Sequence, residues 1–229
     1  MTIESGTKNM MQTRRWANIA LIGIVFYIIL DVVIQMLPPH YSLRQAESDL
    51  AVGPYGWIMD INFVIRGLLS AAIILAIYKS MKNIVRPTVG IVFFAIWSAT
   101  SFLLAFFNTD VPNASLVVSN PTYQGELHLV LALIGFICAP IGILIISIAF
   151  RKEDRLKSLA APALIISILA VLAFLYLGLR GVHARNFGIN ERISIGLVLI
   201  WITVVATKLR QLHTEENPML KTDLHQVNE

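Results

Sequence analysis

The residues with the clearest chemical capacity are Ser48, Asp49 and His128. Together their side chains would supply a nucleophile, an orienting acid and a general base, which are the parts of a hydrolase site. No strained turn of the kind that presents a serine nucleophile surrounds Ser48. Hydrolysis of lipids in the outer leaflet, by His128 with Ser48 and Asp49 or with a bound metal, is therefore an alternative hypothesis, and these three residues are its catalytic candidates.

His128 is also one of several residues that could bind a metal ion. A metal site needs three or four ligands in a closed geometry. The chain contains no HExxH, HxxxH or CxxC spacing, so the sequence predicts no metal and no cofactor. The residues considered as ligands are His40, Asp49, Asp60, His128 and His183.

A wider set of polar residues predicts a site that binds without chemistry. Its members lie at the ends of three apolar segments and in the loop after the first segment, all on one side of the predicted membrane. That side carries acidic, basic and histidine residues, whereas the charged residues of the other side are mainly basic. We expect an outward-facing polar pocket for a lipid headgroup or a small polar ligand. The candidate ligand-binding residues are Arg44, Asp49, Asp60, His128, Glu191 and Arg192.

Two charged residues, Asp31 and Arg66, lie within apolar segments. Because ionisable groups are costly inside a bilayer, they face the interior of a bundle and find partners there. Helical spacing places Asp31 about 9 Å and Arg66 about 13 Å inside their segments from the same side. We expect the two to form an intramembrane polar pair, which is either structural or part of a binding or proton-linked site.

Composition identifies the elements that must position these residues. The chain of 229 residues is 56% hydrophobic and 14% charged, against about a quarter charged in soluble domains. The apolar residues form runs of roughly 20, the length that crosses a bilayer as a helix. The sequence predicts an all-α, polytopic six-helix transmembrane bundle. The predicted spans are 16–37, 57–78, 88–107, 127–149, 159–179 and 193–209.

The basic residues predict the orientation of the bundle. Thirteen of the 18 Lys and Arg residues fall in the two tails and in the loops on the same side, and four fall on the other side. Because excess positive charge stays in the cytoplasm, both termini are expected there. The predicted domains are a cytoplasmic N-terminal tail (1–15), the transmembrane domain (16–209) and a polar C-terminal tail (210–229). The expected location is the cell membrane.

The same charge distribution limits the partners. The formal net charge is +4, but the basic residues cluster at the ends of predicted helices, which is typical of membrane orientation and not of nucleic-acid binding. Membrane lipids and a small polar ligand are the expected partners. An accessory or structural subunit and a small-solute transporter are the remaining alternatives.

The first outer loop, 38–56, carries a local helix signal. Ser42 and Gln45 have the spacing of a capping box, and Leu43, Ala46 and Leu50 share one helical face. We expect a short helix that lies on the outer surface.

The segment 44–57, RQAESDLAVGPYGW, resembles a signature of domain-of-unknown-function family 998, a family of prokaryotic multi-pass membrane proteins. Phe63, Gly67, the Gly125–His128 segment and the pair Glu191 and Arg192 also resemble that family. Its Ser-Asp element and helix-start histidine more distantly resemble the autophagy-modulator and Sfk-type membrane proteins. Glu47 departs from the pattern, because an apolar residue is expected before Ser-Asp. The resemblance implies six membrane helices and no established activity, and carries over Arg44, Ser48, Asp49, Gly67, His128, Glu191 and Arg192.

Overall fold

A computed structural model describes residues 3–38, 40–81, 86–111, 120–181 and 185–215 of the chain. The described residues are helical apart from turns and loops, so the all-α prediction is confirmed. The long helices are α1 (Ile3–Met36), α2 (Gly56–Ser80), α3 (Thr88–Leu103), α4 (Tyr123–Phe150), α5 (Lys157–Arg180) and α6 (Phe187–Glu215). In the described parts of the connections there are three short 3-10 helices: η1 (Glu47–Ala51), η3 (Leu104–Phe106) and η4 (Asp154–Leu156).

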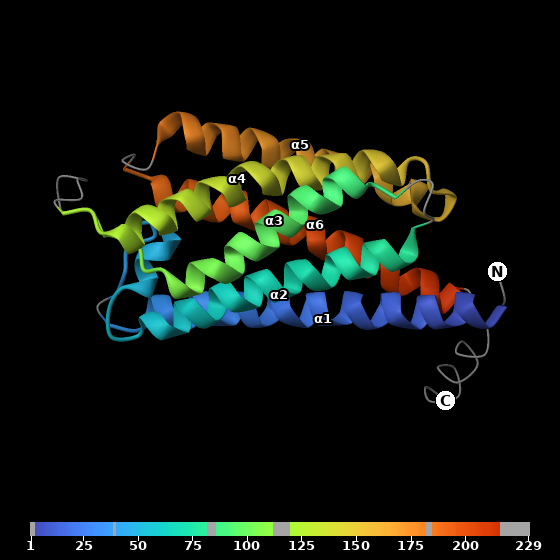
Figure 1. Ribbon diagram of the computed structural model, residues 1–229, viewed down its shortest axis with the longest axis horizontal. Helices are drawn as coiled ribbons and strands as arrows, with labels where there is room; N and C mark the ends of the chain where they lie inside the picture. The colour runs from blue at the N-terminus through green and yellow to red at the C-terminus, as the bar shows by residue number, and fades with distance from the viewer. Residues whose placement is uncertain (1–2, 39, 82–85, 112–119, 182–184, 216–229) are drawn as a thin grey trace.

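The helices run alternately up and down and pack in a ring (Figure 1). Each helix contacts the next one in sequence, and α6 returns to contact α1, α2 and α4. The start of α1 and the end of α6 lie at the same end of the bundle, which we call the terminal end. We call the opposite end, which carries η1, the loop end. Which side of a membrane each end faces remains a prediction.

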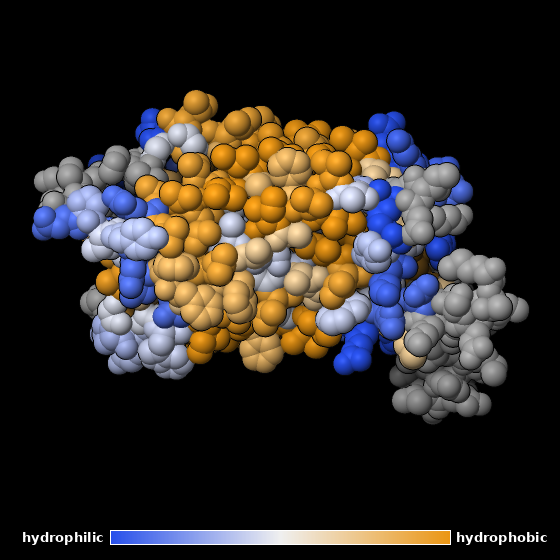
Figure 2. Space-filling view, in the orientation of Figure 1, coloured by the Kyte–Doolittle hydropathy of each residue, from blue (hydrophilic) through white to orange (hydrophobic). Residues whose placement is uncertain are grey.

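All six helices are long and apolar enough to cross a membrane, which confirms the predicted bundle. Figure 2 shows a broad hydrophobic band around the middle of the molecule, with hydrophilic residues gathered at both ends. In α2 the division is visible along a single helix. Ile61, Leu68 and Leu75 are exposed on one side, whereas the polar side chains of Asn62, Arg66 and Ser70 are fully buried on the other.

Helices α1 and α6 extend furthest beyond the spans predicted from the sequence. Helix α1 begins at Ile3 and not near residue 16, and α6 covers Phe187–Glu215 where the prediction has 193–209. Hydropathy locates only the part of a helix that lies in hydrocarbon. Backbone hydrogen bonding continues each helix into the polar region, where apolar residues are no longer needed.

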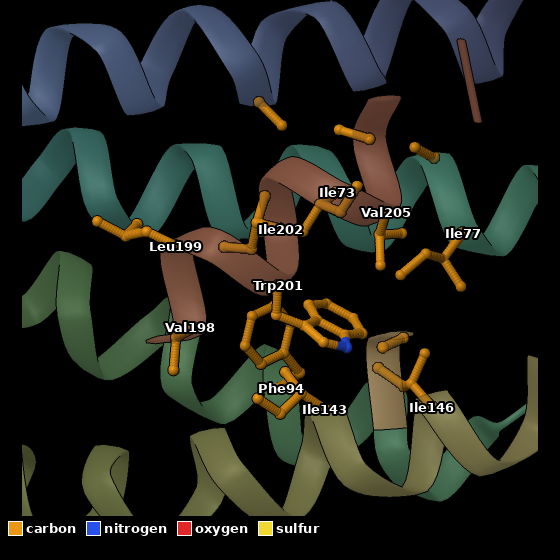
Figure 3. Packing of buried hydrophobic residues seen from close by; sticks show 14 of the residues in the cluster. Ile73, Ile77, Phe94, Ile143, Ile146, Val198, Leu199, Trp201, Ile202 and Val205 are labelled. Atoms are coloured by element: carbon orange, nitrogen blue, oxygen red, sulfur yellow. The ribbon is translucent and has the colours of Figure 1, made fainter. Parts of the chain in front are cut away.

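Trp201 of α6 lies at the centre of the bundle (Figure 3). Its indole packs edge-on against Phe94 of α3, at 5.6 Å between ring centroids. Its Nε1–H donates to the Ser147 hydroxyl at 2.8 Å, and that hydroxyl lies 2.8 Å from the hydroxyl of Ser167. These contacts join α4, α5 and α6, as expected of interhelical hydrogen bonds in an apolar interior.

Close approach of α3 and α4 depends on two glycines. A Cβ added to Gly142 would lie 2.8 Å from the backbone nitrogen of Phe94, and one added to Gly90 would lie 3.0 Å from the Gly142 carbonyl oxygen. Small residues of this kind let helix backbones pack closely where lipid provides no hydrophobic driving force. Gly142 therefore lies on the face of α4 that packs against α3.

The loop between α1 and α2 enters the end of the bundle. The backbone N–H of Ser42 donates to the Gln45 side chain at 3.0 Å, which is half of the expected capping box. The helical part is η1, however, and four of its five residues are buried. The predicted surface helix is therefore wrong, because Leu50 packs with Ile34 of α1 and Phe63 of α2 and draws the segment inward.

Candidate functional site

Arg66 and Glu47 form a buried ion pair at the loop end. Arg66 comes from the interior face of α2 and Glu47 from the first position of η1, and each is only 2% exposed. The Arg66 Nη1 lies 3.6 Å from the Glu47 Oε2. The Tyr27 hydroxyl of α1 donates to the other oxygen of the same carboxylate. One carboxylate thus connects α1, η1 and α2 inside the apolar band.

Two aromatic rings flank the Arg66 guanidinium. Its Cζ lies 5.0 Å from the ring centroid of Phe63 and 5.0 Å from that of Trp97 on α3. Cation–π contacts of this length stabilise a cation that has been removed from water. The rings therefore help to keep a positive charge in a place where it would otherwise be costly.

The sequence predicted Asp31 as the partner of Arg66, and the structure corrects this. The Asp31 carboxylate accepts a hydrogen bond from the Gln35 side chain of the same helix at 2.7 Å, while Arg66 pairs with Glu47. The reason is the inward course of η1, which carries Glu47 to the guanidinium. Helical spacing alone cannot reveal a ligand supplied by a loop.

Glu191 and Arg192, at the start of α6, hold the loop in place. The Glu191 carboxylate accepts a hydrogen bond from the backbone N–H of Glu47 at 2.6 Å. The Arg192 Nη1 donates to the carbonyl oxygens of Leu43 and Gln45, at 3.3 and 3.0 Å. These two predicted residues therefore lie together, although their direct partners are in the loop backbone.

Gly188 provides the surface on which the loop rests. Its backbone N–H donates to the Arg44 carbonyl oxygen at 3.0 Å. A Cβ at this position would lie 1.6 Å from the carbonyl oxygen of Gln45, so only glycine fits. The first turn of α6 has N–H groups without helical partners, and the loop satisfies one of them.

Several buried polar atoms near Arg66 have no hydrogen-bond partner within the part of the chain that the structure describes. They are the Arg66 Nε, the Trp97 Nε1, both side-chain amide atoms of Asn62, and the hydroxyls of Ser70 and Ser101. Asn62, Arg66 and Ser70 share one face of α2, and Trp97 and Ser101 share one face of α3. Two of these groups, the guanidinium and the indole, can only donate. Buried polar groups in proteins are usually paired, so this cluster is unusual. It also includes an acceptor without a hydrogen bond among the described residues, the Glu47 Oε2 beside the guanidinium.

His128 lies next to this cluster on the α4 side. Its Nδ1 is 2.7 Å from the carbonyl oxygen of Phe107, and since a carbonyl only accepts, Nδ1 carries the proton. The ring meets the edge of Phe63 at 6.0 Å between centroids. Phe63 thus contacts both the imidazole and the Arg66 guanidinium.

The remaining predicted residues are less closely connected. The side chains of Arg44 and Ser48 lie at the loop surface, exposed and half-buried, while Asp60 is half-buried with one carboxylate oxygen unpartnered among the described residues. The hydrogen bond of His128 goes to a backbone carbonyl and not to Ser48 or Asp49.

Asp49 has an unusual environment for a loop carboxylate. Burial raises the pKa of its carboxyl from 3.8 to about 6, although a hydrogen bond with the Ala46 backbone and the charge of Arg192 act in the opposite direction. The carboxyl therefore titrates in a range close to neutral pH.

Within the described residues, no three His, Cys, Asp or Glu side chains are grouped as metal ligands would be. His183, one of the residues considered for such a site, lies outside the described part of the chain.

Sequence reasoning missed Glu47 as the centre of the site. Glu47 was noticed only as a departure from the family pattern. That departure is the signal that could have identified Glu47, because an acidic residue at a position expected to be apolar implies a cationic partner. Trp97 was also missed, since a tryptophan within an apolar run does not reveal that its ring covers a guanidinium.

The fold and the buried charges define an integral membrane protein with six spanning helices. The family described as "Protein of unknown function (DUF998)" matches residues 21–208, and the chain belongs to that family. Comparisons with curated proteins and with solved structures give no match.

Proposed function

We propose that the protein binds a ligand with an anionic group, either a lipid headgroup or a small free molecule, at Arg66 beneath the loop end, without catalysing a reaction. The observation that carries the proposal is the group of unpartnered donors around a buried guanidinium. Arg66 Nε and Trp97 Nε1 can only donate, and Asn62, Ser70 and Ser101 can donate as well. Within the described chain, the unpartnered acceptors beside them are Glu47 Oε2 and Asn62 Oδ1, and a carboxylate or phosphate would supply further ones.

The Glu47 carboxylate is the group that the ligand would replace. It already contacts Arg66 at 3.6 Å, a longer separation than the 2.7–2.9 Å of a strong charge-assisted hydrogen bond. In this proposal Glu47 neutralises Arg66 when no ligand is present, and a ligand that binds Arg66 directly takes its place.

Access to Arg66 then requires the loop to move. Glu191 and Arg192 hold the loop through the backbone of residues 43–47 and not through its side chains. Loosening these bonds would release Glu47 and open the loop end. The predicted residues Glu191 and Arg192 therefore act in the proposal as the closure of the site, with Arg44, Asp49, Asp60 and His128 around its rim.

A thermal-shift experiment on the purified chain in detergent tests the proposal. A ligand that binds only the folded state raises the melting temperature with concentration. The probes are glycerol 3-phosphate, inorganic phosphate and acetate, with choline as a cationic control and a dispersed short-chain phosphatidic acid as the lipid form. At least one anionic probe is expected to raise the melting temperature, and choline is not. Preference for phosphatidic acid over glycerol 3-phosphate would identify a lipid as the source of the anion.

Asn62→Leu distinguishes binding from a structural role. Because Asn62 makes no hydrogen bond to another described residue, replacing its amide removes an unsatisfied buried group, which costs about 1–3 kcal/mol when left unpaired. The variant is expected to melt at the same or a higher temperature without ligand and to lose the anion-induced shift. A lower melting temperature, or an unchanged shift, would contradict the proposal.

A further inference from the structure

A groove crosses the terminal end of the bundle, away from the Arg66 site. It consists of two adjoining hollows of about 340 and 230 Å³ that share Thr207 and Gln211 of α6. The first lies between α5 and α6, and the second extends to Arg14 on α1. Nothing in the function proposed for Arg66 involves this groove.

The polar part of the groove is suited to an anion. Arg14 and Arg210 line one hollow and Lys208 lines the other, and no acidic residue is among the described residues that line them. The hydroxyls of Ser158 and Thr207 add hydrogen-bond donors, whereas the Thr203 hydroxyl already donates to the carbonyl oxygen of Leu199 at 2.8 Å. Ser158 also lies in the first turn of α5, where the helix dipole favours negative charge.

The other part of the groove is apolar. Leu159 and Pro162 of α5 and Val204 of α6 line it. Along the same helices toward the middle of the molecule, Ile165 of α5 is 59% exposed and Ile200 of α6 is 51% exposed. The groove therefore leads from a basic rim toward exposed apolar side chains of the spanning helices α5 and α6.

From this arrangement we propose that the groove binds one anionic phospholipid. The phosphate lies among Lys208, Arg210 and Arg14, and an acyl chain follows the surface formed by Pro162 and Val204, toward Ile165 and Ile200. Basic pockets between membrane helices at the level of the headgroups recognise anionic lipids in this way. A soluble phosphate would use only the rim, so the apolar continuation favours the lipid.

Native mass spectrometry of the full chain tests the proposal. The protein is titrated in detergent with dioleoyl phosphatidylglycerol, with dioleoyl phosphatidylcholine as a neutral lipid of the same chains. A single phosphatidylglycerol is expected to bind more tightly than phosphatidylcholine. The double variant Lys208→Gln/Arg210→Gln is expected to weaken this binding roughly 25-fold, since each basic residue contributes about fivefold.

Matched controls separate the groove from general surface charge. Arg151→Gln/Lys152→Gln removes two exposed charges at the same end, and Arg15→Gln removes the exposed neighbour of Arg14. Both are expected to leave the affinity within twofold of the parent chain. Arg14→Gln, in contrast, should weaken it about fivefold.

A second variant tests the shape of the groove without changing its charge. Thr207 is exposed and borders both hollows, so Thr207→Trp fills the groove while the bundle stays folded. It is expected to reduce phosphatidylglycerol binding at least tenfold. Equal binding of the two lipids, equal losses in the groove and control variants, or full binding by Thr207→Trp would each overturn the proposal.

Discussion

At the scale of single residues, the ion pair of Arg66 and Glu47 is the feature on which the loop end depends. Both side chains are buried, and the carboxylate also accepts a hydrogen bond from Tyr27. A buried pair of this kind contributes little compared with apolar residues, but removing one partner leaves an uncompensated charge. The pair therefore links the stability of the loop to that of α1 and α2.

Arg66→Met is expected to lower the free energy of unfolding by about 3–5 kcal/mol, because it leaves Glu47 buried without its cation. The double variant Arg66→Met/Glu47→Gln should regain most of that loss. Denaturant unfolding of the purified protein in mixed micelles measures both. Arg44→Met, an exposed arginine of the same loop, is the control and should change stability by less than about 0.5 kcal/mol. A double variant no more stable than Arg66→Met would contradict the pairing.

The raised pKa of the Asp49 carboxyl predicts that the stability of the protein depends on pH. Its pKa is raised to about 6 in the folded state, so the folded state binds a proton more tightly than the unfolded chain does. The stabilisation is fully present below the unfolded pKa of about 3.9 and is lost as pH rises through 6. Between these limits the loss is at most about 3 kcal/mol.

Asp49→Asn should remove this part of the pH dependence and make the protein more stable near pH 7. The measurement is the melting temperature at intervals from pH 4 to pH 7. Glu126→Gln, which alters an exposed carboxylate at the same end, serves as the control and should leave the profile unchanged. If Asp49→Asn follows the profile of the parent chain, the carboxyl is not titrating in this range.

At the scale of elements, the position of the loop between α1 and α2 depends on its contact with the start of α6. The loop backbone at residues 43–45 lies directly on Gly188, and Arg192 donates to two of its carbonyl groups. The contact involves backbone atoms on the loop side, so it depends on the shape of the loop more than on its side-chain chemistry.

Gly188→Ala is expected to displace the loop, since the new Cβ would overlap the Gln45 carbonyl. Hydrogen exchange of residues 43–51 should become faster, and the melting temperature should fall. Gly196→Ala in the same helix is the matched control, because nothing lies within 4 Å of its added Cβ. Alanine forms helices better than glycine by about 1 kcal/mol, so that variant should be neutral or stabilising. Slow exchange in Gly188→Ala would show that the loop does not rest on α6.

Particular elements explain what could be predicted from the sequence. The six helices were predictable because the bilayer demands runs of about 20 apolar residues, and the buried face of α2 was predictable because Asn62, Arg66 and Ser70 recur every four residues. The position of η1 was not. A five-residue 3-10 helix has no periodicity of its own, and Leu50 is buried only because α1 and α2 already provide a surface for it. Because η1 carries Glu47 to Arg66, the partner of Arg66 could not be predicted either.

At the scale of the whole molecule, the two ends differ in kind. The loop end is closed by η1 over a neutralised cation, while the terminal end has a groove bordered by Arg14, Lys208 and Arg210. The predicted topology places the loop end outside and the terminal end in the cytoplasm, because basic residues concentrate at the latter. Under that orientation the proposed anion site would be reached from outside, and the proposed lipid site from the inner leaflet.

The orientation of the bundle therefore decides from which side of the membrane each proposed site is reached. Single cysteines at exposed positions, Glu126→Cys at the loop end and Arg151→Cys at the terminal end, are placed in a chain whose own Cys138 is replaced by alanine. A membrane-impermeant maleimide is then applied to intact cells that express each variant. The account predicts that the cysteine at 126 reacts, and that the one at 151 reacts only after the membrane is permeabilised. Labelling at 151 in intact cells, with the cysteine at 126 protected, would contradict it.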